Sequence, residues 1–352
     1  KLCSIAADGA VTVLGDVGGT DDNLVTMTYS FDLLAIASGQ KLFYWNGTTV
    51  DQVTDPDLGP VLDVVWVDGY FMTTDGEFLV VTELLDPFAV NPLKYGSSEI
   101  DPDPVVALVK LRNEIYALNR HTIEIFDNVG GNLFPFQRVE GAQIQKGVIG
   151  THACCVFVET IAFLGSGRNE SPGIFMGVNA QANKISTKEI DEVLTDYTEA
   201  QLATVKLEAR NDRNHQHLYV HLPDQTIVFD LTATQATNTP VWFVLSSSTV
   251  GLARYKARDI IWCYNKWLIG DPTSSTIGYF ENNIGSHYDE KVSWEFSTNI
   301  VYNEGRGAIF HELELVALTG RVAFGTNPVI TTSYSVDGEN WSQSRSIKVG
   351  TQ

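Results

Sequence analysis

Short apolar strands recur along this chain in groups, and tight turns separate them. The clearest group covers residues 63–67, 70–74 and 77–82, with Asp68-Gly69 and Asp75-Gly76 as its turns. Related groups of two or three strands lie at 33–45, 105–126, 217–230 and 260–280. They recur at roughly 40–50 residues, which is the spacing of β-propeller blades.

The pattern predicts an all-β fold with a β-propeller over residues 31–290. Between five and seven blade-like units fit the sequence, and six is the number we predict. Strands such as 61–67 are apolar almost throughout, as expected when neighbouring blades cover both faces of a sheet. A set of β-sandwiches is the alternative that this pattern leaves open.

Two further regions depart from the blade pattern. Ser186-x-x-Glu189 and Thr198-x-x-Gln201 are capping-box patterns followed by apolar residues, so we expect a short helical insertion at 187–206. After about residue 290 the strands alternate more strictly, which indicates part of a C-terminal β-sandwich over 291–352. That sandwich is either incomplete or completed by N-terminal strands from residues 1–30.

Composition limits the classes of function. The formal net charge of the 352 residues is −20, and such a chain should repel DNA because nucleic-acid affinity comes mainly from Lys and Arg. Ordinary solubility and a surface that DNA passes without sticking both fit this charge. No run of 18 apolar residues occurs, so we expect no membrane span. Because the chain has no initiator Met, we expect it to be a piece of a longer protein.

Three histidines form the only metal candidate that we single out. His215, His217 and His221 would share one face of a continuous strand, and imidazoles suit zinc, copper or nickel. A strand with solvent-facing histidines explains the pattern equally simply, and we favour it. The four cysteines lack Cys-x-x-Cys spacing and are expected to be free thiols. We therefore predict no bound metal and no cofactor.

No catalytic constellation stands out, so we predict that the chain is not an enzyme. Ser335-x-Asp337-Gly338-x-x-Trp341 is similar to the Asp-box turn of sialidase-like propellers, which is a folded hairpin rather than a catalytic group. A sialidase would also need an arginine cluster for its carboxylate substrate. Gly165-Ser166-Gly167 lacks the Gly-Lys-Ser/Thr ending of a phosphate loop and is interpreted as a turn between strands.

Several short motifs in series resemble one family, the packaged-DNA-stabilisation or tail-hub (tail accessory factor) proteins of short-tailed phages, the podoviruses. The motifs keep their order and spacing across about 140–342. They are Ile144-Gln-Lys-Gly-Val-Ile-Gly-Thr151, the stretch from Ile185 to Tyr197-Thr-x-x-x-Leu202, His221-Leu-Pro with Val228-Phe-Asp230, Trp242-x-Val-Leu245, Ser286-x-Tyr-Asp289, Leu313-Glu-Leu with Gly320, and Asp337-Gly338-x-x-Trp341.

The resemblance implies a structural protein of the virion tail, made in the cytoplasm of the bacterial host. Such proteins form a homo-hexamer beneath the portal–adaptor ring, close the portal vertex after packaging, and contact the tail needle and tailspike or fibre proteins. DNA would pass the channel without sequence-specific binding. Within the family only the His-Leu-Pro element at 221–223 matches, which weakens a metal role for the histidines. A carbohydrate-binding or sialidase-like propeller is the alternative.

Overall fold

The computed structural model describes residues 1–20, 24–84, 86–98, 100–298, 300–301, 303–316 and 328–349. The chain divides into two compact units, Lys1–Ser293 and Trp294–Gln352. Gly320, the end of one family motif, lies outside the described residues. No helix among the described residues is long and apolar enough to cross a membrane.

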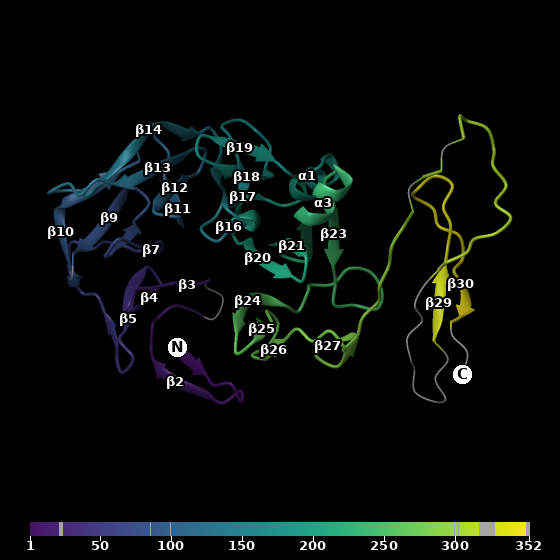
Figure 1. The fold of residues 1–352 in the computed structure, drawn as a ribbon, viewed down its shortest axis with the longest axis horizontal. Helices are drawn as coiled ribbons and strands as arrows, with labels where there is room; N and C mark the ends of the chain where they lie inside the picture. Colours follow the sequence, from purple (N-terminus) through teal and green to yellow (C-terminus); the bar gives the residue numbers. More distant parts are fainter. Residues whose placement is uncertain are drawn as a thin grey trace. The chain divides into compact units, whose positions relative to one another are not determined.

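Six antiparallel sheets make up most of the first unit, and they follow one another around a centre in chain order (Figure 1). The predicted all-β propeller and its six blades are thereby confirmed. The first three blades contain β3 (Thr26–Tyr29), β4 (Leu34–Ser38), β5 (Lys41–Trp45) and β6 (Val50–Gln52); β7 (Asp63–Val67), β8 (Tyr70–Thr74), β9 (Phe78–Glu83) and β10 (Asp86–Ser97); and β11 (Val105–Leu111), β12 (Glu114–Asn119), β13 (Ile123–Asn128) and β14 (Phe136–Ile144).

The last three blades differ in strand number, and the fourth has a divided inner strand. They contain β15 (Gly147–Val148), β16 (Cys154–Phe157), β17 (Thr160–Ser166), β18 (Gly173–Val178) and β19 (Gln181–Lys184); β20 (Lys206–Asp212), β21 (His215–His221), β22 (Thr226–Asp230) and β23 (Trp242–Leu245); and β24 (Arg258–Cys263), β25 (Lys266–Gly270) and β26 (Ile277–Tyr279). In the fourth blade, β15 and β16 pair with successive parts of β17. A short hairpin of β27 (Ser286–His287) and β28 (Glu290–Lys291) follows.

Gly165 lies inside β17, so the interpretation of residues 165–167 as a turn is wrong for this glycine. It pairs with Val148 of β15 on one side and with Gly173 of β18 on the other. A side chain at Gly165 would overlap the carbonyl oxygen of Gly147. The glycine is therefore needed for close backbone approach rather than for a turn.

The hydrophobic core is shared between neighbouring blades. The largest cluster of buried residues runs through the third, fourth and fifth blades and includes Phe163 and Phe229, both almost fully buried. It also includes Leu194 and Leu202 of the helical insertion. Burial of both sheet faces explains why the strands read as continuous apolar runs.

The first two strands of the chain pack with the propeller. The hairpin of β1 (Leu2–Ile5) and β2 (Val11–Gly15) contributes Leu2 to a core cluster with Ile36 and Phe43 of the first blade. The hydroxyl of Tyr264, next to the sixth blade, donates to the backbone oxygen of Ile5 at 2.6 Å. The hairpin thus contacts the first and last blades.

Three helices occur among the described residues. In the expected insertion, α1 (Lys188–Thr195) and α2 (Glu199–Leu202) lie between the fourth and fifth blades. Thr198 and Gln201 form the capping box that the sequence indicates, whereas α1 begins after Thr187 and has no side-chain cap. The Ser186 hydroxyl instead donates to Asp191 at 2.7 Å. The third helix, α3 (Leu231–Thr237), was not expected from the sequence.

The second unit is sparsely packed where it is described. Its strands β29 (Val329–Thr332) and β30 (Arg345–Lys348) form one antiparallel pair. None of its described residues is a buried hydrophobic, and Trp294 is 83% exposed. The Asp337 side chain accepts hydrogen bonds from the backbone of Glu339 and Asn340. Asp337 therefore organises a hairpin turn, as the sequence indicates.

A buried carboxyl joins the second and third blades. Asp63 is 3% exposed, and its Oδ2 accepts a hydrogen bond from the backbone N–H of Leu108 at 2.8 Å. Burial raises the pKa of Asp63 to about 6, although the N–H groups of Leu108 and Val64 oppose this. The folded protein consequently holds a proton here at a pH where the unfolded chain has lost it.

We expect this carboxyl to make stability depend on pH. Its contribution is fully present below about pH 4 and is lost as the pH rises through about 6, because the folded pKa lies above the unfolded value. Asp63→Asn keeps an uncharged acceptor. It should therefore remove this change of the unfolding free energy with pH, measured by denaturant unfolding between pH 4 and 6. Asp8→Asn, on an exposed side chain, is the matched control. An unchanged slope in Asp63→Asn would refute the assignment.

Candidate functional site

The histidines predicted from the sequence lie along one face of β21, but the structure divides them into two groups. His215 Nδ1 lies 2.6 Å from Asp230 Oδ2, and His217 Nε2 lies 3.5 Å from the same oxygen. The rings of His215 and His217 stack with centroids 5.7 Å apart. His221 is not part of this group. The structure therefore brings two of the three histidines together and adds Asp230 as a third polar group.

Sequence reasoning missed Asp230 because it belongs to the next strand and starts α3. Its side chain accepts a hydrogen bond from the backbone N–H of Ala233 at 3.0 Å, as an N-cap residue does. A cap signal was present in the sequence, since Asp230 directly precedes the segment 231–237. Asp230 is also opposite His217 in the pairing of β21 with β22.

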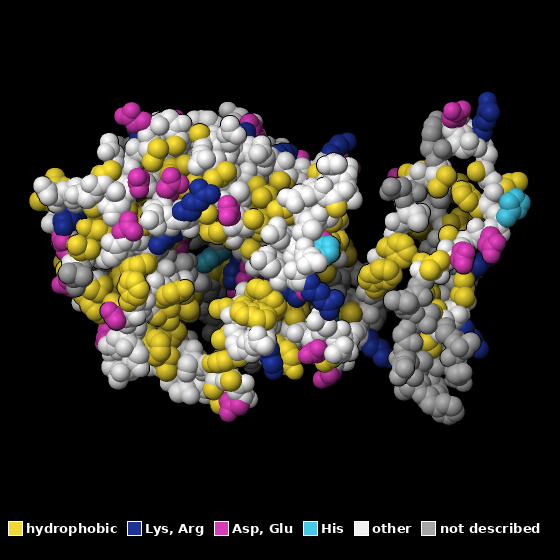
Figure 2. Space-filling view, in the orientation of Figure 1, with side chains coloured by type: hydrophobic (Ala, Val, Ile, Leu, Met, Phe, Trp, Pro, Cys, Tyr) yellow, Lys and Arg dark blue, Asp and Glu magenta, His cyan; other side chains and the backbone are white. Residues whose placement is uncertain are grey.

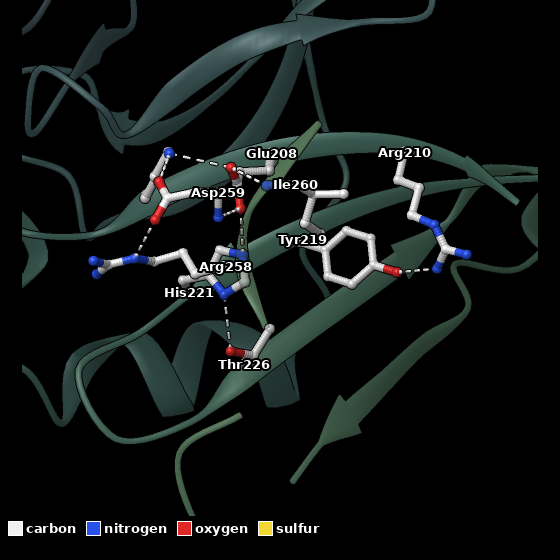
Figure 3. Close-up of polar contacts among 9 residues, drawn as sticks. Glu208, Arg210, Tyr219, His221, Thr226, Arg258, Asp259 and Ile260 are labelled. Atoms are coloured by element: carbon white, nitrogen blue, oxygen red, sulfur yellow. Dashed lines mark hydrogen bonds and ion pairs between the residues drawn. The ribbon is translucent and has the colours of Figure 1, made fainter. Parts of the chain in front are cut away.

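His221 belongs to a second polar group, between the fifth and sixth blades (Figure 3). Its Nε2 lies 3.0 Å from Glu208 Oε2, and its Nδ1 lies 3.1 Å from the Thr226 hydroxyl. Glu208 also accepts hydrogen bonds from the backbone N–H groups of Asp259 at 2.9 Å and Ile260 at 3.1 Å. One buried carboxylate of β20 thus binds the beginning of β24 in the next blade.

Lys206 completes this interblade group. Its ammonium lies 3.1 Å from Glu208 and also pairs with Asp259, which in turn pairs with Arg258 at 3.4 Å. Burial alone would raise the pKa of Glu208, but the neighbouring His221 and Lys206 hold it below its usual value. Burial opposes the charge of Lys206 as well, yet Glu208 and Asp259 raise its pKa. The group is therefore an ionised network that stabilises the contact between two blades.

Arg210 forms a further contact between the same blades. Its guanidinium donates to the Tyr219 hydroxyl at 3.1 Å (Figure 3). It also lies 4.1 Å from the centre of the Phe280 ring. Arg210 is 8% exposed, so this cation–π contact is largely shielded from water. The polar side chains in this region pair with one another at the contact between the two blades.

A pocket of about 480 Å³ lies among the inner loops and strands of the first, second, fourth, fifth and sixth blades. Figure 2 shows a hollow near the centre of the ring of blades. The polar side chains that line the pocket belong to Ser38, Gln40, Thr151, His152, Thr204, Arg254 and Arg258. Burial, aided by the positive charge of Lys206, lowers the pKa of His152 to about 4, so this imidazole is neutral at neutral pH.

This axial pocket is basic rather than acidic. Arg254 and Arg258 line it, and no carboxylate is among the described residues that do so. Partial burial and the neighbouring charge of Arg258 lower the pKa of Arg254. On the face shown in Figure 2, the Asp and Glu side chains are spread over the propeller instead of gathering in one patch. On this face the acidic side chains therefore form no single patch.

Two known families match the chain, one over the propeller and one over the C-terminal segment. Residues 1–285 match the family described as bacteriophage P22 Gp10, β-propeller, and residues 293–352 match the family described as bacteriophage P22 Gp10, β-sandwich. This chain belongs to the P22 Gp10 family. The predicted resemblance to tail-hub proteins of short-tailed phages is confirmed by these matches, as is a C-terminal segment of β-sandwich type.

Among the relatives of this Gp10 family member is the tail hub protein gp10 of Salmonella phage P22. It is 26% identical over 355 residues, which cover 95% of this chain and 72% of the relative. The solved structures that it resembles include PorZ of the type-IX secretion system of Porphyromonas gingivalis, with a TM-score of 0.39, 11% identity and coverage of 77% of this chain and 32% of PorZ. The WD40 domain of Neurospora crassa Pan2 has a TM-score of 0.42, 11% identity and coverage of 70% and 72%.

Proposed function

We propose that this chain is a structural tail hub protein of a short-tailed phage. The observation that carries the proposal is that both parts of the chain match the Gp10 family, and that its relative in phage P22 is a tail hub protein. In this role the protein closes the portal vertex, stabilises packaged DNA and docks tailspikes or fibres. It acts as a homo-hexamer in the virion tail and not as an enzyme.

The physical properties of the propeller fit this role. Charged networks such as the one around Glu208 hold neighbouring blades together, which gives a rigid body for contacts around a ring. A net charge of −20 repels DNA, so DNA would pass a channel lined by such subunits without sequence-specific binding. The host cytoplasm is the place of synthesis in this proposal.

The alternative, a carbohydrate-binding or sialidase-like propeller, has less support. A sialidase holds its substrate carboxylate with a cluster of arginines in the central funnel. Two arginines, Arg254 and Arg258, line the axial pocket among the described residues. The pocket therefore offers fewer than the three arginines that a sialidase-like site would require.

The proposal is tested by assembly with the partners it names. The full-length protein, mixed with portal–adaptor complexes from the same phage genome, should form a six-subunit ring on them, which sedimentation and negative-stain microscopy would detect. Portal complexes without the adaptor ring are the control and should bind less protein. A protein that stays monomeric and does not bind either complex would refute the proposal.

A further inference from the structure

Three possible metal ligands converge at the beginning of β21. His215, His217 and Asp230 each offer one ligand atom, and these atoms all lie within 4.8 Å of one another. The nitrogens that face Asp230 Oδ2 are Nδ1 of His215 and Nε2 of His217. The two histidines are two residues apart on a strand, so their side chains leave the same face. Asp230 is opposite His217 on β22, which brings its carboxylate to that face.

The carboxylate is already oriented. Asp230 is 5% exposed, and its Oδ1 accepts the cap hydrogen bond from Ala233, which leaves Oδ2 facing the two imidazoles. The hydrogen bond to Oδ1 fixes the carboxylate, as hydrogen bonds to ligating carboxylates do in metal sites. The side chain of His215 is about half exposed, so an ion can reach the group from solvent.

His217 is only weakly held by protein partners. Its Nε2 is 3.5 Å from Asp230, at the limit of a hydrogen bond, and its Nδ1 is buried with no partner among the described residues. Nε2, the ring nitrogen that faces Asp230, is the atom available to an ion.

Two imidazoles and one carboxylate are a ligand set of zinc sites in which a water completes the tetrahedron. Bond lengths of about 2.0–2.1 Å place tetrahedral ligand atoms about 3.3 Å apart. The 2.6 Å and 3.5 Å separations from Asp230 Oδ2 bracket this value. The two imidazole nitrogens are within 4.8 Å of each other, so an ion would draw these two side chains together.

We propose that His215, His217 and Asp230 bind one first-row divalent cation, Zn²⁺ in preference, with water in the fourth position. The ion would join β21, the end of β22 and the start of α3, and would stabilise the outer part of the fifth blade. His221 takes no part in this site, because Glu208 and Thr226 occupy its two ring nitrogens. The site is independent of the tail-hub function.

The test uses the chain without an affinity tag, first freed of metal by a chelator. Titration with Zn²⁺ by calorimetry should show one site, and Co²⁺ should give the visible absorption bands of tetrahedral coordination. His215→Ala should weaken Zn²⁺ binding by about tenfold or more, since losing even an outer-shell partner of a ligand costs 10–100-fold. Asp230→Asn should do the same, and it keeps a side chain able to cap α3.

His311→Ala, which removes an exposed imidazole in the second unit, is the matched control and should bind Zn²⁺ like the unmodified chain. Zn²⁺ should also raise the unfolding temperature of the unmodified chain and of this control, but not of the other two variants. The absence of stoichiometric binding would overturn the proposal. So would binding that His215→Ala and Asp230→Asn leave unchanged.

Discussion

Glu208→Ala should lower the free energy of unfolding by about 3–5 kcal/mol, because it removes one partner of a buried charged network. The carboxylate is 9% exposed and contacts Lys206 and His221. Without it, the Lys206 ammonium loses one of its two counter-ions. The backbone N–H groups of Asp259 and Ile260 also lose their acceptor. Each loss leaves a polar group without its partner at the contact between two blades.

Denaturant unfolding of the intact chain measures this effect, and hydrogen exchange locates it. Amides of β24 should exchange faster in Glu208→Ala, while those of the second blade keep their protection. Glu208→Gln retains a carbonyl acceptor and should lose less stability. The matched control is Glu159→Ala, whose side chain is 82% exposed in a pair with Arg112 and should change stability by less than about 0.5 kcal/mol. Equal stability of Glu208→Ala and this control would contradict the network.

Gly165→Ala should destabilise the fourth blade by about 3 kcal/mol, the upper end of the range for overpacking. The added methyl group would overlap the backbone carbonyl of Gly147 on β15, and backbone atoms in a paired strand cannot move aside as a flexible side chain does. Separation of β15 from β17 is the structural change we expect. The same unfolding measurement applies, with hydrogen exchange at Val148 as the local reporter.

Gly285→Ala is the control for this glycine. Nothing lies within 4 Å of a Cβ added there, so the change in unfolding free energy should stay within about 0.5 kcal/mol. Equal stability of the Gly165→Ala and Gly285→Ala variants would show that β15 does not approach β17 as closely as described.

The sequence was informative where apolar strands are separated by recognisable turns. The strands at 63–67 and 70–74 coincide with β7 and β8, because Asp68-Gly69 suits the positive φ angles of a two-residue hairpin turn. The fourth blade was not recognised as a blade. Its glycines resemble turn signals, yet Gly165 and Gly173 pair inside the sheet. Local pattern cannot distinguish a glycine that bends the chain from one that makes room for a neighbouring strand.

The candidate metal ligands were predictable in part. Alternation along one strand places His215 and His217 on one face, and the structure agrees. The same alternation placed His221 on that face, but six residues of strand separate it from His215 by about 20 Å. Asp230 joins through the register between β21 and β22, which a single sequence does not specify. Asp259 and Ile260, which donate to Glu208, belong to the next blade and could not be predicted from local pattern for the same reason.

Cryo-electron microscopy of purified virions from the phage that encodes this chain is the most direct test of its role as a tail hub protein. We predict six copies of the propeller around the exit channel, directly beneath the portal and adaptor ring. Virions whose tail contains no density for this propeller, and no peptide of the chain by mass spectrometry, would contradict it.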